Sequence, residues 1–140
     1  MNIGFIGPAA ALGLAAIGSA LGTGVAGQAS MGAWKKCFAS NRPAPFILVL
    51  FCGAPLTQTI YGFLLMLFIQ RSQQEPLLLL SAGIFGGLAI GFSAMMQGRA
   101  AAGAADALAD TGKGLANYLT AIGIIETVAL FVIILLSLIL

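Results

Sequence analysis

The chain has 140 residues, of which 60% are hydrophobic and only 7% charged, and its net charge is +2. A small soluble domain cannot bury so much apolar surface, so the composition indicates a membrane protein. The small net charge gives no reason to expect nucleic acid as a partner. The apolar runs are continuous and rich in Ala, Leu and Gly, whereas the strands of a membrane β-barrel alternate polar and apolar residues. We therefore predict an all-α membrane protein.

The first half of the chain, residues 1–74, is predicted to form a helical hairpin. One membrane span is expected from about residue 8 to 33 and a second from about 45 to 70, because each holds roughly 20 mostly apolar residues. A polar loop, Trp34 to Pro43, separates them. No basic residue precedes the first apolar segment, so we expect it to be retained rather than cleaved as a signal peptide.

The second half, residues 75–140, is predicted to form another hairpin. A polar turn ending in Glu75 and Pro76 leads into a span from about residue 77 to 109. A Gly-containing turn then opens the last span, from about 115 to 140. The chain is thus expected to be a four-helix bundle with its loops kept short.

The two hairpins are related by an internal repeat. A shift of 74 positions aligns Gly13 with Gly87 and Ser19 with Ser93, and a shift of 68 positions aligns Gln58 with Glu126. The difference between the shifts falls in the longer first loop. We read this as a tandem duplication in which the second copy has a carboxylate and the first copy has an amide.

Basic residues predict the orientation in the membrane. The turns inside the two hairpins contain Lys35, Lys36, Arg42 and Lys113, whereas the turn between the hairpins contains only Arg71. Short cytoplasmic loops are enriched in Lys and Arg. We expect both hairpin turns to face the cytoplasm.

Of the four acidic residues, Glu126 is the only one in the predicted hydrocarbon zone, because Glu75, Asp106 and Asp110 lie in or beside turns. A charged side chain in that position costs about 3 kcal/mol or more, so such residues are usually functional and have polar partners. A protonated glutamate in a purely structural interhelical hydrogen bond is the alternative explanation.

Depth along the helices predicts which residues could join Glu126. At about 1.5 Å per residue, Glu126 and Gln97 lie about 20 Å on either side of the second hairpin turn, and Gln58 lies at a similar depth in the first hairpin. Thr57 belongs to the same layer, and Tyr61 shares a helix face with both Thr57 and Gln58.

This layer offers a carboxylate, two amides and a hydroxyl, and all-oxygen sets suit hard cations. Pro55 frees nearby backbone carbonyls, around Gly53 and Ala54, which could turn toward an ion. One carboxylate balances one monovalent charge. The pattern therefore favours sodium, and a proton is the alternative because it would need Glu126 alone.

Small residues recur at four-residue spacing on the first and third spans. Such stripes let helices approach closely. We expect them to pack many copies around a narrow inner circle, with larger residues of the second and fourth spans facing lipid. The stripes are Gly18, Gly22, Ala26 and Ser30 on the first span, and Gly83, Gly87 and Gly91 on the third; the larger residues include Phe63, Met66, Phe68 and Phe131.

The duplicated hairpin and the segments Pro55–Phe63, Gln97–Ala101 and Ile125–Thr127 resemble the rotor proteolipids of bacterial sodium-pumping V-type ATPases. The resemblance covers nearly the whole chain. It implies a closed ring of identical copies in the cell membrane, turned by ATP hydrolysis in a separate soluble head. The chain would be a non-catalytic subunit without a covalent cofactor. Its other partners would be a stator subunit that supplies an arginine and a central stalk at the cytoplasmic hairpin turns.

The resemblance also implies roles for individual residues. The transported ion, sodium or alternatively a proton, would be held by several side chains and one backbone carbonyl. The implied ligands are Thr57, Gln58, Gln97 and Glu126 with the carbonyl of Ala54, and Tyr61 would hydrogen-bond the carboxylate. Ala54 is smaller than the residue expected there, which matters little for a main-chain ligand.

Two other functions fit four spans and one membrane carboxylate. A small proton-coupled multidrug exporter would have its essential glutamate in the first span and more aromatic residues than the 9% found here. A purely structural bundle would keep its function after Glu126→Gln. The sequence has no His and no nucleophile-base pair, so we do not expect an enzyme.

Overall fold

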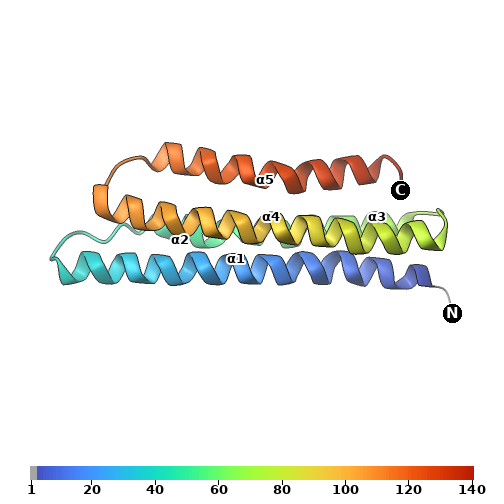
Figure 1. Ribbon diagram of the computed structural model, residues 1–140, viewed down its shortest axis with the longest axis horizontal. Helices are drawn as coiled ribbons and strands as arrows, with labels where there is room; N and C mark the ends of the chain where they lie inside the picture. The colour runs from blue at the N-terminus through green and yellow to red at the C-terminus, as the bar shows by residue number, and fades with distance from the viewer. Residues whose placement is uncertain (1–2) are drawn as a thin grey trace.

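The computed structural model describes residues 3–140, and over these residues it is an all-helical bundle (Figure 1). Residues 1–2 of the predicted first hairpin lie outside the described part. The elements are the 3₁₀ turn η1 (Ile3–Phe5), α1 (Ile6–Ala39), α2 (Leu48–Gly53), the 3₁₀ turn η2 (Ala54–Leu56), α3 (Thr57–Arg71), α4 (Pro76–Thr111) and α5 (Leu115–Ser137).

Within residues 3–140, four helical segments are long and apolar enough to cross a membrane: Ile3–Ala39, Leu48–Arg71, Pro76–Thr111 and Leu115–Ser137. The second of these is continuous through α2, η2 and α3. The predicted fold class is confirmed. The described part begins and ends at the same end of the bundle, as an even number of antiparallel spans requires (Figure 1).

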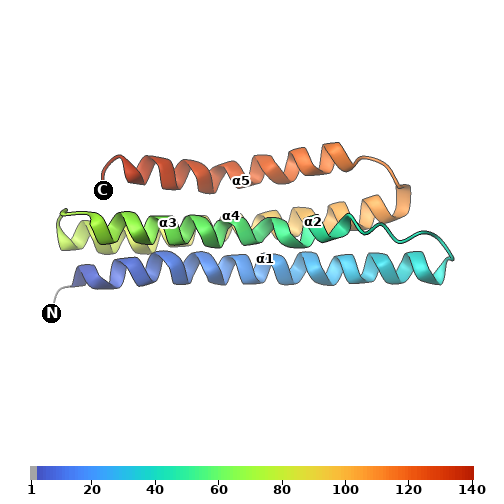
Figure 2. The ribbon, with the colours of Figure 1, turned by 180° about the vertical axis from the view of Figure 1, so that it is seen from behind.

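The bundle is layered around α4. Figure 1 shows α4 between α1 and α5, and the reverse view in Figure 2 shows α2 and α3 running in front of α4. Helix α1 and helix α5 each pack on both α3 and α4. Because α3, α4 and α5 all contact one another, side chains from these three helices can meet.

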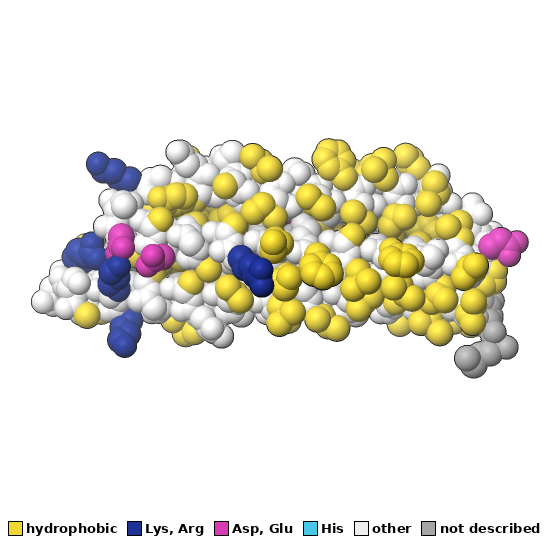
Figure 3. Space-filling model, viewed as in Figure 1, with side chains coloured by type: hydrophobic (Ala, Val, Ile, Leu, Met, Phe, Trp, Pro, Cys, Tyr) yellow, Lys and Arg dark blue, Asp and Glu magenta, His cyan; other side chains and the backbone are white. Residues whose placement is uncertain are grey.

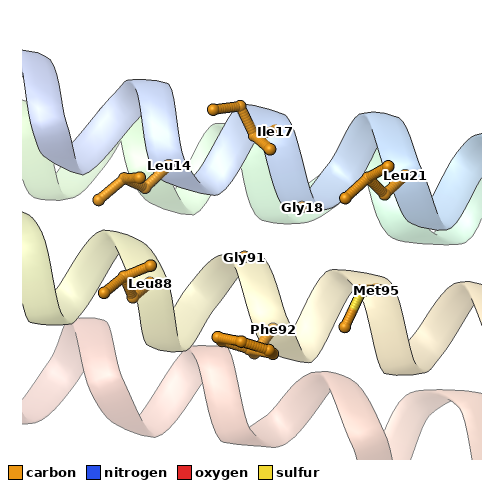
Figure 4. Close-up of a pocket in the computed structure, with 8 residues that line it drawn as sticks. All are labelled: Leu14, Ile17, Gly18, Leu21, Leu88, Gly91, Phe92 and Met95. Atoms are coloured by element: carbon orange, nitrogen blue, oxygen red, sulfur yellow. The ribbon is translucent and has the colours of Figure 1, made fainter.

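Helices α1 and α4 touch along a seam of small residues. A methyl group added at Gly18 would overlap the backbone of Gly91, and one added at Gly98 would overlap the backbone of Gly22. Figure 4 shows Gly18 and Gly91 facing each other across this seam, beside an apolar groove of about 160 Å³. The expectation that these stripes pack against other copies is wrong, because the stripe of α1 packs against that of α4 within one chain.

Several large apolar side chains point out of the bundle, as predicted for the second and fourth spans. Phe63, Phe68 and Phe131 are exposed, whereas Met66 is partly buried against the core. Exposed residues also occur on α1 and α4, including Ile17 and Phe92. All sides of the bundle thus present apolar surface of the kind that lipid or another chain covers.

The predicted loop from Trp34 to Pro43 is wrong in its first part, because α1 continues to Ala39. Lys35 and Lys36 are good helix formers and do not break the helix. The chain leaves the helix at Asn41, which has a positive φ of 51°. The next span starts at Leu48 rather than near residue 45, and the last helix ends at Ser137 rather than Leu140.

Charged residues gather where α1 and α4 end, as Figure 3 shows. Lys36 Nζ lies 2.5 Å and 2.7 Å from the two carboxylate oxygens of Asp110. Arg42 donates a hydrogen bond of 3.3 Å to the backbone carbonyl of Asp110. These contacts join the turn of the first hairpin to the turn of the second and give the bundle one polar end.

Candidate ion-binding site

Glu126 lies on the face of α5 that is turned toward α3 and α4. Its Oε1 atom is 2.7 Å from the Thr57 hydroxyl and 2.7 Å from the Tyr61 hydroxyl. Its Oε2 atom accepts a hydrogen bond of 3.1 Å from Gln97 Nε2. The residue is partly exposed at the side of the bundle. Three helices therefore hold one carboxylate at a position that remains reachable from outside the chain.

Behind the carboxylate, two glutamines form a fully buried amide pair. Gln58 and Gln97 are both 0% exposed. Gln58 Nε2 donates to Gln97 Oε1 over 2.9 Å, while Gln97 Nε2 also donates to the carbonyl of Ile122 over 3.2 Å. Both hydrogens of the Gln97 amide are thereby used, on Ile122 and Glu126, so its oxygen must face Gln58.

This arrangement fixes the orientation of the Gln58 amide and leaves its oxygen without a hydrogen-bond partner within the described residues. Because the Gln58 nitrogen faces Gln97, its oxygen points elsewhere. A buried polar atom without a partner costs about 1–3 kcal/mol. The site thus contains a buried oxygen that is free to bind something else.

The local sequence explains why Thr57 and Tyr61 reach the carboxylate. Pro55 interrupts the second span with the 3₁₀ turn Ala54–Leu56, and Thr57 begins α3 directly after it. Thr57 and Tyr61 then lie one turn apart on the same face of α3. The carbonyl of Ala54 is 2.9 Å from the Thr57 hydroxyl, so it belongs to the same cluster.

The Thr57 hydroxyl lies within hydrogen-bond distance of two acceptors, Ala54 O and Glu126 Oε1. It has one hydrogen and can donate to only one of them. With an ionised Glu126 the hydrogen belongs to the carboxylate. With a protonated Glu126, the carboxyl donates to Thr57, and Thr57 donates to Ala54. The same heavy-atom positions thus suit a charged and a protonated carboxyl.

The structure brings all six predicted site residues together: Ala54, Thr57, Gln58, Tyr61, Gln97 and Glu126. Arg99, two positions after Gln97, points away and contacts the sulfur of Met96 on the exposed side of α4. Among residues 3–140, no basic side chain is hydrogen-bonded or ion-paired to Glu126. The carboxylate is therefore held by neutral groups alone.

Ser93 is a further neighbour of the site, which was not predicted from the sequence. Its hydroxyl donates a hydrogen bond of 3.0 Å to the carbonyl of Ile125, the residue before Glu126. Ser93 lies one turn before Gln97 on the same face of α4, and this spacing could have identified it. It ties α4 to α5 directly beside the carboxylate.

One comparison with known proteins bears on these observations. The chain is 35% identical over 112 residues to the A-type ATP synthase subunit K of Methanocaldococcus jannaschii. The chain is a homologue of that K subunit. The alignment covers 77% of this chain and 48% of the relative, so the chain spans about half the length of the relative. No family model matches the chain.

The predicted resemblance to the proteolipids of rotary ATPases is confirmed by this similarity to a K subunit. Four helices capable of crossing the membrane fit a duplicated proteolipid. The relative's name says nothing about which ion is carried or which residues bind it.

Proposed function

We propose that this chain is a non-catalytic rotor-ring subunit of a rotary ATPase and that Glu126 carries one monovalent cation per chain. The observation that supports this most strongly is the hydrogen-bonded Glu126, a single carboxylate in a membrane span surrounded by neutral oxygen and amide groups from three helices. A loaded site of this kind is electrically neutral and can pass through lipid, whereas an empty one would carry an uncompensated charge.

Sodium is the proposed ion because the cluster contains more oxygen atoms than a proton needs. The carboxylate of Glu126, the hydroxyl of Thr57 and the carbonyl of Ala54 form one cluster. Gln58, the residue after Thr57, adds a buried oxygen that has no partner within the described residues. Together with the oxygen of Gln97, these would replace the hydration shell of a small hard cation. Tyr61 would keep the carboxylate oriented through its hydrogen bond to Oε1.

A proton is the second candidate, and one observation favours it. The Thr57 hydroxyl lies between Ala54 O and Glu126 Oε1 in a chain of contacts that a protonated Glu126 would complete. A protonated Glu126 is neutral, so the site then needs no cation to balance the charge of the carboxylate. Sodium and protons would then compete for the same carboxylate.

The position of Glu126 at the side of the bundle supports assembly into a ring. A partly exposed carboxylate there can be covered by the next copy and can meet an arginine on a stator subunit. The polar end formed by Lys35, Lys36 and Lys113 would carry the central stalk on the cytoplasmic side of a bacterial cell membrane. Copies in a closed ring would bury much of the exposed apolar surface against one another.

The duplication of the hairpin, residues 1–74 and 75–140, is part of this proposal. In the second hairpin Ser93 contacts Ile125. The two shifts found in the sequence map this pair onto Ser19 and Thr57 in the first hairpin. A methyl group added at Gly22 would meet the Pro55 side chain, and one added at Gly62 would meet the Ala15 side chain, so Ser19 and Thr57 lie at nearly the same level. This similarity supports a common register of helix packing in the two hairpins.

Labelling of Glu126 by a hydrophobic carbodiimide, with and without sodium, tests the proposed site and ion together. Sodium should protect Glu126 from labelling in a concentration-dependent way, and potassium should not. Glu126→Gln should abolish labelling and coupled transport while the ring still forms, because glutamine has nearly the same shape. Glu75→Gln, outside the predicted spans, is the matched control and should change neither.

Labelling that depends on pH but is indifferent to sodium would identify a proton site instead. Unchanged transport in Glu126→Gln would identify a structural bundle and contradict the proposed function altogether.

A further inference from the structure

Helix α1 contributes no residue to the hydrogen bonds around Glu126, yet it carries a buried hydroxyl close to them. Ser19 is 1% exposed, and its Oγ atom has no hydrogen-bond partner within the described residues. A buried serine usually donates to a backbone carbonyl or to another side chain. The Ser19 hydroxyl is therefore expected to have a hydrogen-bond partner that is not a protein atom of the described residues.

The packing of α1 on α3 places Ser19 at the level of Gln58. A Cβ added at Gly22 would lie 3.0 Å from the Pro55 side chain, and one added at Gly62 would overlap the side chain of Ala15. The two helices run antiparallel, so residues between these two contacts face one another in reverse order. Gln58 lies midway between Pro55 and Gly62 on α3. Ser19 lies midway between Ala15 and Gly22 on α1, so the two residues are at the same level.

The atom of Gln58 that lacks a partner is an acceptor, and Ser19 has an unused donor. Gln58 Oε1 has two lone pairs, so it can bind an ion with one and accept a hydrogen bond with the other. The two side chains are not in direct hydrogen-bond contact. One internal water accepts from a serine hydroxyl and donates to an amide oxygen, and it satisfies buried polar atoms of this kind.

The second hairpin contains a related contact. Ser93 aligns with Ser19 in the internal repeat, and its hydroxyl donates directly to the backbone carbonyl of Ile125, the residue before Glu126. A serine of α4 thus lies at the level of Glu126 on α5, and a serine of α1 lies at the level of Gln58 on α3.

We propose that Ser19 is a positioning residue of the ion site, linked through one internal water to the side-chain oxygen of Gln58. The link holds the Gln58 amide in the orientation that gives its nitrogen to Gln97 and its oxygen to the ion. Through Gln97, which donates to Glu126, the hydroxyl on α1 sets how tightly the carboxylate binds its cation. The inference rests on the proposed function.

Ser19→Ala tests this in the assembled ring, with sodium protection of Glu126 from carbodiimide labelling as the measurement. We expect the sodium concentration for half protection to rise about three- to tenfold, as for the loss of one hydrogen bond. Ser30→Ala is the matched control, because Ser30 is also buried on α1 and has no hydrogen-bond partner among residues 3–140, but it lies about 16 Å farther along the helix. It should leave sodium protection unchanged.

A double-mutant cycle distinguishes positioning through Gln58 from a general loosening of the bundle. In a Gln58→Ala background, Ser19→Ala should have no further effect on sodium protection, because the link is already missing. An equal loss in both backgrounds, or an equal effect of Ser30→Ala, would overturn the proposal. So would unchanged protection in Ser19→Ala.

Failure of the proposed function has a separate signature. If sodium does not protect Glu126 in the unmodified ring at any concentration, sodium protection cannot serve as the measurement. The pH dependence of Glu126 labelling is then measured instead. A shifted pH profile in Ser19→Ala, absent in Ser30→Ala, would still support the positioning role at a proton site. Identical profiles in all three rings would overturn it.

Discussion

Gln58 and Gln97 are joined by a direct hydrogen bond, with 2.9 Å between the nitrogen of one amide and the oxygen of the other. Both side chains are completely buried. The bond crosses from α3 to α4, so it couples the first half of the chain to the second at the depth of Glu126. Any change to one amide leaves the other with an unpaired buried group.

Gln97→Ala should therefore weaken sodium protection of Glu126 by at least about tenfold, since it removes hydrogen bonds to both Gln58 and the carboxylate. Thr57→Ala should act in the same direction and let protons compete more strongly at low pH. Competition between sodium and protons for labelling of Glu126 measures both. Gln70→Ala, on the exposed side of α3, is the control. Sodium dependence unchanged in both site variants would indicate a proton site.

Tyr61→Phe should retain the ring but weaken sodium binding by about three- to tenfold, because it removes one of two hydroxyl contacts to Glu126 Oε1. The aromatic ring itself stays in place, so packing is preserved. Tyr118→Phe removes a hydroxyl that makes no contact with the site and should have no such effect. Equal sodium affinity in Tyr61→Phe would show that Tyr61 does not stabilise the bound state.

Gly18→Ala should destabilise the bundle strongly, by about 1–3 kcal/mol or more, because the new methyl group overlaps the backbone of α4. Gly24→Ala, on the same helix, meets nothing within 4 Å and should leave stability equal or raise it by up to about 1 kcal/mol. Thermal unfolding of the two variants in the same detergent compares them. Similar melting of both would contradict the direct backbone contact between α1 and α4.

Lys35, Lys36 and Lys113 should react with a membrane-impermeant amine reagent from the cytoplasmic side only. All three are exposed at the polar end of the bundle. Right-side-out and inside-out vesicles provide the two directions of access. Labelling from outside the cell would invert the proposed topology.

In mild detergent the protein should run as a large ring, because the partly exposed Glu126 and the outward apolar residues need cover. Size measurement by light scattering with detergent correction is the direct check. A uniform population of monomers would contradict ring assembly.

Much of the site was predictable because the rise of an α-helix is fixed. Counting residues from the turns brought Gln58, Gln97 and Glu126 to one depth, and Pro55 marked the break that precedes Thr57. Residue types alone did not reveal which way each amide points. That orientation depends on a chain of hydrogen bonds that ends at the carbonyl of Ile122. Every residue has a backbone carbonyl, so the sequence does not show which one accepts the hydrogen bond.

The partners of the small-residue stripes were not predictable in the same way. A stripe such as Gly18 and Gly22 shows that another helix comes close, but it does not show whether that helix belongs to the same chain. The end of α1 was also missed, because Lys35 and Lys36 are polar enough for a loop and equally suited to a helix. The break comes only at Asn41 and Pro43.

The seam between α1 and α4 has a mechanical consequence. Backbone packed on backbone has no layer of side chains that could change rotamer, so this pair of helices is stiff. Helix α5 is attached differently: only Ile122, Ala129 and Ile133 are buried along it, and it starts after Gly112 and Gly114, which both have positive φ. Movement of Glu126 relative to the rest of the chain is therefore expected in α5, while α1 and α4 should move together as one rigid unit.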